Sequence, residues 1–313
     1  MSEEIALAEL LSTGLAAYQR TLREVFPQIW ERLLAEMARP APVARLSSVY
    51  NEGYLLRDGG EAAPLLALDL VTPKSVPERT YQSMLDTLPE VALLLISHRH
   101  GDHLDAEVIR RLLDAGTMVA LPQDAWEALP SKVNAGKRPD NVRVVTAGAS
   151  FEAAGATIRV HAAEHLSEKV RESVAYEIQL GSVTIVHAAD HRGFEQGVPT
   201  WPRGADVLIM SYYHPELDDD SPTVKPASMA GMMADDAWRT RLRWDRDAAL
   251  ISFIQRLAPR TFVPGHIYEL GHEPEKLWRF VDVALTREAL FARAPEISVR
   301  SLAPGECLPL LPR

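Results

Sequence analysis

The sequence is poor in cysteine, in positive charge and in long apolar runs, and each shortage excludes a class of protein. Its single cysteine, Cys307, can form neither an internal disulfide nor a thiolate zinc site by itself. Lysine and arginine total 33 against 43 aspartates and glutamates, and the resulting charge of −10 disfavours binding to nucleic acid through its phosphates. The longest apolar runs, such as Val91–Ile96, are far shorter than the roughly 20 residues of a membrane span.

Several common catalytic signatures are also missing. The sequence contains no Gly-x-Ser-x-Gly nucleophile elbow, no glycine-rich phosphate loop and no dinucleotide fingerprint. Its first residues, Met1–Glu4, carry acid where a secretion signal carries base. We therefore expect a soluble, cytoplasmic protein that acts on a small molecule, without nucleic-acid or membrane partners.

The first 38 residues are predicted to be helical, because apolar side chains recur every three or four positions and form one stripe. The stripe consists of Leu7, Leu11, Leu15, Tyr18, Leu22, Val25, Ile29 and Leu33. Pro27 interrupts the stripe and predicts a kink or the start of a second helix. A helical extension, residues 1–42, thus precedes a main domain, residues 43–313. We expect the stripe to pack on the chain's own core, with a homo-oligomer contact or a cover over the active site as alternatives.

Beyond residue 43, short apolar strands alternate with helical stretches. The predicted strands are Ala44–Val49, Pro64–Val71, Val91–Ser97, Met118–Leu121, Asn141–Val145, Ala156–Ala162, Val174–Leu180, Val183–Ala188, Val207–Ser211 and Arg260–Val263. The predicted helices are Val76–Leu85, Asp105–Leu113, Pro122–Leu129, Trp244–Leu257 and Pro274–Leu290. The Gly181-Ser182 pair between two strands is typical of a hairpin turn. This mixture indicates an α/β fold in which sheets are packed between helices.

Four residues that commonly bind metals, His98, His100, Asp102 and His103, fall within six positions directly after an apolar strand. His98 and His100 are two apart, so on extended backbone their side chains point the same way and can bind one ion. Asp102 and His103 follow where the chain is expected to turn at Gly101, and they can bind a second ion nearby. Buried together without metal, these groups would leave polar atoms unpaired. The pattern therefore predicts a metal site.

Further residues of the same kinds follow later apolar strands. They are His165, Asp190 and His266. An aspartate can bridge two ions with its two oxygens, and His266 can complete the second site. His161 is an alternative to His165, which we favour because it stands at the exit of its strand, whereas His161 falls inside the strand.

At this point the sequence resembles a known family. The window from His98 to His103 matches the His-x-His-x-Asp-His signature of the metallo-β-lactamase-fold hydrolases, and His165, Asp190 and His266 match the remaining ligands in order. The resemblance covers roughly residues 44–300 and is closest in pattern to the L-ascorbate-6-phosphate lactonase-like branch. It implies a four-layer αββα sandwich of two mixed sheets, to which the helical extension is added.

The resemblance also implies a centre of two divalent ions, with Zn²⁺ favoured and Mn²⁺ or Fe²⁺ as alternatives. Three histidines, His98, His100 and His165, would bind the first ion. Three further residues, Asp102, His103 and His266, would bind the second. Asp190 would bridge the two ions, together with a water or hydroxide.

Other residues are expected to support this centre. Asp69, on the strand before the histidine window, is expected to orient a ligand histidine. His187 is expected to be a hydrogen-bonded core histidine, and Arg99 to form a structural ion pair. Asp102 and His214 are candidates for carrying a proton during catalysis. The candidates for contacts with substrate or with the ligands are His191, Tyr212, Tyr268 and His272, and His272 is also an alternative to His266 as a ligand.

The function expected from these residues is hydrolysis of a small ester-type substrate, such as a lactone, thioester, amide or phosphoester. In this reaction the metal ions activate a bridging hydroxide. Two alternatives remain: an iron-dependent redox enzyme on the same fold, and a non-catalytic metal-binding interaction module. Iron enzymes of the family commonly carry glutamate at the position of His100, which favours the hydrolase.

Overall fold

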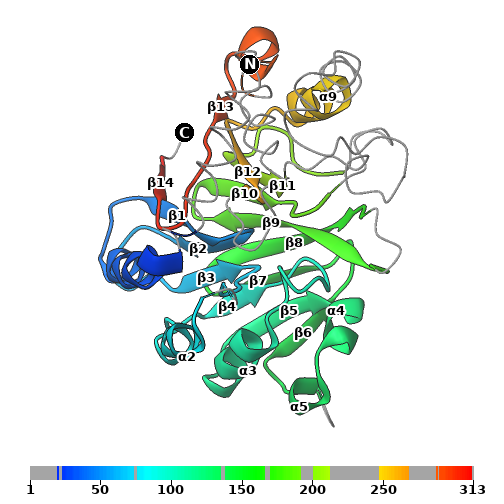
Figure 1. The fold of residues 1–313 in the computed structure, drawn as a ribbon. Helices are drawn as coiled ribbons and strands as arrows, with labels where there is room; N and C mark the ends of the chain where they lie inside the picture. The colour runs from blue at the N-terminus through cyan, green and yellow to red at the C-terminus, as the bar shows by residue number, and fades with distance from the viewer. Residues whose placement is uncertain are drawn as a thin grey trace, which may run out of the picture.

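A computed structural model of the chain describes residues 20, 23–73, 76–134, 138–165, 170–191, 200–211, 247–267, 287 and 289–311. Two seven-stranded sheets make up most of it (Figure 1). The first sheet has the order β14-β1-β2-β3-β4-β5-β6. Its strands are β1 (Ala44–Tyr50), β2 (Gly53–Arg57), β3 (Leu65–Leu68), β4 (Leu93–Leu95), β5 (Met118–Pro122), β6 (Val142–Val145) and β14 (Cys307–Leu310).

The second sheet has the order β13-β12-β11-β10-β9-β8-β7. Its strands are β7 (Ser150–Ala153), β8 (Ala156–Ala163), β9 (Ser173–Leu180), β10 (Val183–His187), β11 (Val207–Ser211), β12 (Thr261–Gly265) and β13 (Ser298–Val299). The helices with assigned bounds are α2 (Glu78–Asp86), α3 (Ala106–Asp114), α4 (Gln123–Ala128), α5 (Ser131–Asn134) and α9 (Asp247–Leu257). In Figure 1, α2 to α5 lie on one outer side of the pair of sheets and α9 lies on the other.

Each sheet is mixed, with antiparallel pairs in one half and parallel pairs in the other. In the first sheet β14, β1, β2 and β3 pair antiparallel, and β3, β4, β5 and β6 pair parallel. In the second sheet β7 to β10 pair antiparallel, and β10 to β13 pair parallel. Because parallel strands end at the same edge of a sheet, residues that follow β3 and β4, or β10, β11 and β12, are brought together.

Three separate apolar clusters lie between the layers. One lies under α2, α3 and α4 against the first sheet, a second fills the space between the sheets, and a third lies between the second sheet and α9. The short strand β4 is buried along its whole length, which is typical of a parallel strand covered on both faces. Two mixed sheets with flanking helices confirm the predicted αββα sandwich.

The helical extension contributes to the first of these clusters. Residues 23–38 form one helix that continues through Pro27. The alternative prediction, that a second helix begins at Pro27, is therefore wrong. Of the predicted stripe, Ile29 and Leu33 are buried in this cluster and Val25 is partly buried against it. Phe26, Trp30 and Met37, which the predicted stripe did not include, are buried in the same cluster. Within the described part of the helix, the apolar stripe therefore packs on the chain's own core.

Four strands, β2, β7, β13 and β14, have no counterpart among the predicted ones. The last of these contains Pro309, which a sheet accepts because β14 is an edge strand. The hairpin at Gly181 is confirmed by the antiparallel pairing of Leu180 with Val183. Most of the predicted helix Pro274–Leu290 lies outside the described residues. Among the described residues, no helix has the length and apolarity that a membrane crossing requires.

Candidate metal centre

The candidate centre lies where strands of both sheets end. The first sheet supplies Asp69 after β3 and the window His98–His103 after β4. The second sheet supplies His165 after β8, Asp190 after β10 and His266 after β12. Residues up to 197 positions apart in the chain, Asp69 and His266, are thus brought to one place by the fold.

The histidine window forms a tight turn that leads into α3. The backbone N–H groups of His103 and Leu104 both donate to the carbonyl of His100, at 3.0 and 2.8 Å. Asp105 caps α3 by accepting from the backbone N–H of Glu107 at 3.0 Å. Gly101 is not in the left-handed region, and a Cβ there would meet nothing within 4 Å. The chain turns at Gly101 as expected, although the backbone conformation and the free space there do not require a glycine.

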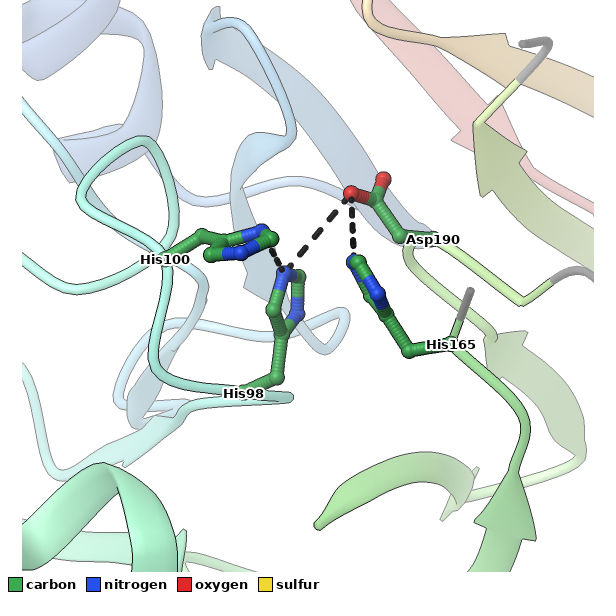
Figure 2. Close-up of side chains that lie close together, drawn as sticks. All are labelled: His98, His100, His165 and Asp190. Atoms are coloured by element: carbon green, nitrogen blue, oxygen red, sulfur yellow. Dashed lines mark hydrogen bonds and ion pairs between the residues drawn. The ribbon is translucent and has the colours of Figure 1, made fainter. Parts of the chain in front are cut away.

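The first group of donor atoms combines three imidazoles and one carboxylate: His98, His100, His165 and Asp190. His98 Nε2 lies 3.2 Å from His100 Nδ1, and Asp190 Oδ2 lies 3.7 Å from His98 Nε2 and 3.5 Å from His165 Nε2. Figure 2 shows the three rings and the carboxylate pointing toward one another. Three imidazoles with one carboxylate are a donor set that suits Zn²⁺.

The second group lies beside the first and consists of Asp102, His103 and His266. His266 Nε2 lies 2.9 Å from His103 Nε2 and 3.7 Å from Asp102 Oδ2. Asp190 reaches this group as well, with Oδ1 3.1 Å from His266 Nε2 and Oδ2 3.6 Å from His103 Nε2. The carboxylate of Asp190 therefore faces both groups, which is the position a bridging ligand needs.

Asp69 is buried behind the second group and fixes the ring of His103. Its Oδ2 accepts from His103 Nδ1 at 2.9 Å and from His187 Nε2 at 2.9 Å, while its Oδ1 accepts from the backbone N–H of Ser97 at 2.7 Å. With its proton held on Nδ1, His103 presents the lone pair of Nε2 to the centre. This arrangement fits a metal ligand.

The charges of the metal-free site oppose one another. Burial alone would raise the pKa values of Asp69 and Asp190, but nearby histidines outweigh it: His103 and His187 lower the pKa of Asp69, and His266 and His103 lower that of Asp190. Burial alone would lower the pKa of His103, but Asp190, Asp102 and Asp69 raise it well above its usual value. Burial and the charge of His103 hold the pKa of His98 well below its usual value.

Backbone strain is concentrated around the site. Non-glycine residues with positive φ include Asn51 (57°), Asp69 (39°), Ala189 (42°) and His266 (56°), and each of them is a site residue or is adjacent to one. Such conformations are uncommon for residues with a Cβ, and they persist where surrounding contacts hold them in place. The strain at Asp69 and His266 shows that the fold fixes the backbone of both residues.

Two residues that contact the site, Glu52 and Ser211, were missed by the sequence analysis. Glu52, in the turn between β1 and β2, is fully buried, and its Oε1 accepts from the hydroxyl of Ser211 at 2.7 Å. The same hydroxyl contacts Asp190 Oδ1. Burial raises the pKa of Glu52, against the opposing effects of His266, His187 and His103. The only signal in the sequence was an acidic residue in a turn, which is ordinary at a surface.

Several other predicted residues lie beside the cluster and not in it. His161 faces Glu177, with Nε2 2.9 Å from Oε2, so it is His165 that meets Asp190. Arg99 pairs with buried Asp124 at 3.1 Å. His191 is buried, and its Nδ1 accepts from the backbone N–H of Glu164 at 3.0 Å, next to His165. The remaining predicted residues, Tyr212, His214, Tyr268 and His272, lie outside the described residues.

Comparison with known proteins gives a family match over most of the chain. Residues 68–267 match the model of the beta-lactamase superfamily domain. That span runs from the last residue of β3 to just past His266 and contains all seven predicted ligands. A search of curated proteins gives no match.

Solved structures share the fold at low sequence identity. Igni18, a metallo hydrolase from Ignicoccus hospitalis, aligns with a TM-score of 0.54 and 15% identity over 85% of this chain and 97% of its own. YhfI from Bacillus subtilis, a metallo-beta-lactamase fold protein, aligns with a TM-score of 0.50 and 15% identity over 85% of this chain and 98% of its own. CmlA from Streptomyces venezuelae, a diiron beta-hydroxylase, aligns at 0.54 and 16% over 87% of this chain but 55% of its own.

Proposed function

The chain belongs to the beta-lactamase superfamily, and from this we propose that it is a metal-dependent hydrolase with a dinuclear zinc centre acting on a small ester-type substrate. Lactones, thioesters, amides and phosphoesters are the substrate classes open to this chemistry. The observation that carries the proposal is the position of Asp190. Its Oδ2 lies 3.5 Å from His165 of the first group, and its Oδ1 lies 3.1 Å from His266 of the second.

The chain's own residues would bind the ions and transfer the proton. His98, His100 and His165 would bind the first ion, Asp102, His103 and His266 the second, and Asp190 both. Bound divalent ions supply an activated water and polarise the carbonyl or phosphoryl oxygen of the substrate. Asp102 has a side chain that is 36% exposed, so it is the carboxylate best placed to pass a proton between the centre and solvent.

The alternative is an iron-dependent redox enzyme, and a similar fold is found in the diiron beta-hydroxylase CmlA. The first group favours zinc, because it contains the imidazole of His100 at the position where iron enzymes of the family commonly carry glutamate. A third alternative is a non-catalytic metal-binding module, which would bind the ions through the same residues but hydrolyse no substrate.

Metal analysis followed by a substrate screen tests the proposal. The purified chain is expected to be colourless, to contain zinc and to hydrolyse at least one of a panel of lactone, thioester and phosphodiester substrates. His100→Ala is expected to abolish that activity, whereas His161→Ala, which removes a histidine that pairs with Glu177 and lies outside the cluster, is expected to retain it. A coloured protein that contains iron and shows no hydrolysis would favour the redox alternative.

A further inference from the structure

Glu52 is a buried carboxylate that the seven-ligand scheme leaves without a role. It lies in the two-residue connection between β1 and β2, and none of its surface is exposed. Burying a carboxylate is unfavourable unless a positive charge or several hydrogen-bond donors compensate for the lost water. The buried position of Glu52 therefore requires a positive charge or hydrogen-bond donors close to its carboxylate.

The protein partners of Glu52 compensate for only part of its burial. Oε1 accepts from the hydroxyl of Ser211, but Oε2 is buried and has no hydrogen-bond partner. Among the described residues, no lysine or arginine forms an ion pair with Glu52. One carboxylate oxygen is therefore available to a ligand that is not part of the chain.

The surroundings of Glu52 indicate the kind of ligand. Donor atoms of Glu52, Asp190 and His266 all lie within 4.8 Å of one another. Two buried carboxylates this close together repel each other, and a cation between them and an imidazole removes that repulsion. Because His266 belongs to the second group of donor atoms, Glu52 lies on that side of the centre.

Gly265 provides an independent sign that the carboxylate belongs there. A Cβ at Gly265 would lie 1.7 Å from Glu52 Oε1 and 2.4 Å from Oε2, so no other residue fits while Glu52 keeps its position. The φ of Gly265 is not in the left-handed region, so its backbone conformation does not require glycine. The glycine is explained by the space that the carboxylate occupies.

We propose that Glu52 is an additional metal ligand, which contributes a carboxylate oxygen to the ion on the His266 side of the centre. This inference rests on the proposed dinuclear centre and extends its ligand set to an eighth residue. With Glu52, the second ion is bound by the carboxylates of Asp102, Asp190 and Glu52 and the imidazoles of His103 and His266. Such an oxygen-rich set suits Mn²⁺ or Fe²⁺ better than the histidine-rich first set does.

The test is calorimetric titration of the metal-depleted full chain with Mn²⁺ and, separately, with Zn²⁺. Glu52→Gln is expected to bind the first ion as the wild type does and the second ion at least about tenfold more weakly, with the larger loss for Mn²⁺. Glu177→Gln is the matched control, because Glu177, on β9, is a buried glutamate as Glu52 is, but pairs with Arg159 and His161. It is expected to bind both ions unchanged.

Two further variants keep the proposal testable if Glu52→Gln does not fold. Gly265→Ala leaves Glu52 in the chain but forces its carboxylate to move. It is expected to lower the affinity for the second ion in the same way. Ser211→Ala removes the hydrogen bond to Oε1 of Glu52 and is expected to lower the affinity for the second ion less than Glu52→Gln does. Equal losses in Ser211→Ala and Glu52→Gln would show that Glu52 acts only by holding Ser211, and would overturn the ligand role.

The outcomes separate this inference from the proposed function. If the wild type binds two ions and Glu52→Gln binds both with unchanged affinity, the inference is wrong and the dinuclear hydrolase stands. If the wild type binds no ion of either metal, both are wrong.

Discussion

Asp69 accepts a hydrogen bond of 2.9 Å from Nδ1 of His103 in the fully buried interior behind the candidate metal centre. The same oxygen accepts from His187, and the hydroxyl of Ser97 donates to it at 2.6 Å. Every neighbour of Asp69 Oδ2 is thus a donor, which only an acceptor can satisfy. The carboxylate therefore sets which nitrogen of His103 carries the proton and where its lone pair points.

Asp69→Asn is predicted to lower metal affinity without removing a ligand. An asparagine can place its NH₂ group toward His103 or His187, which disturbs the hydrogen bonds and the ring orientation. Loss of such an outer partner typically lowers metal affinity by roughly 10–100-fold. Titration of the metal-depleted protein measures the change, with circular dichroism to check the fold. Unchanged affinity for both ions would show that Asp69 has no part in positioning His103.

Metal binding is predicted to depend on pH differently at the two groups. In the metal-free protein the pKa of His103 is raised, so at neutral pH an ion entering the second group must displace a proton. The pKa values of His98 and His100 are lowered, so these ligands are already neutral.

The affinity for the second ion should therefore increase as pH rises toward the raised pKa of His103. The affinity for the first ion should change little above about pH 6.5, the usual pKa of histidine. Calorimetry between about pH 5 and 8, in buffers of different ionisation enthalpy, measures both the affinities and the protons released. Release of no proton with the second ion would contradict the assignment.

Asp124 is predicted to stabilise the loops on either side of the centre. It is buried and accepts from Arg99, within the histidine window, and from the backbone and side chain of Arg171, in the segment that follows β8. Asp124→Asn should lower the free energy of unfolding by about 2 kcal/mol, since both arginines are partly exposed and solvent weakens their pairing. Urea unfolding measures this, with Glu90→Gln, at an exposed position, as the control.

The same variant gives a pH test with a defined sign. Burial alone would raise the pKa of Asp124, but Arg171 and Arg99 lower it. A carboxylate with a lowered folded-state pKa adds stability above its unfolded pKa, about 3.9, and loses it as pH falls. The difference between wild type and Asp124→Asn should therefore shrink below about pH 4. A difference that grows as the pH falls would contradict the ion-pair account.

Trp30 is predicted to attach the N-terminal helix to the first sheet. Its ring is buried, and its Nε1 donates to Thr87 Oγ1 at 3.0 Å. Trp30→Ala should destabilise the protein by about 3–5 kcal/mol, as expected for removal of a large buried side chain. Exposed Glu31→Ala on the same helix is the control in thermal and urea unfolding. If both variants unfold alike, the helix does not contribute to the core.

Residues whose positions follow from local pattern were predictable, and residues whose positions depend on distant partners were not. His98, Asp190 and His266 each follow an apolar strand, so their position at a sheet edge could be inferred from the sequence. The choice of His165 over His161 followed from position, because His165 stands past the end of its strand, whereas His161 lies within β8, where it faces Glu177. Glu52 could not be found, because its burial depends on Ser211, 159 residues away, and on Gly265.

Counting the metal ions bound per chain shows whether Asp190 bridges two of them. Metal analysis of the wild type after equilibration with Zn²⁺ and removal of free metal should give two ions per chain. Asp190→Asn, which loses the charge that faces both groups, should retain one ion at most. Two tightly bound ions in Asp190→Asn, or fewer than two in the wild type, would contradict the account.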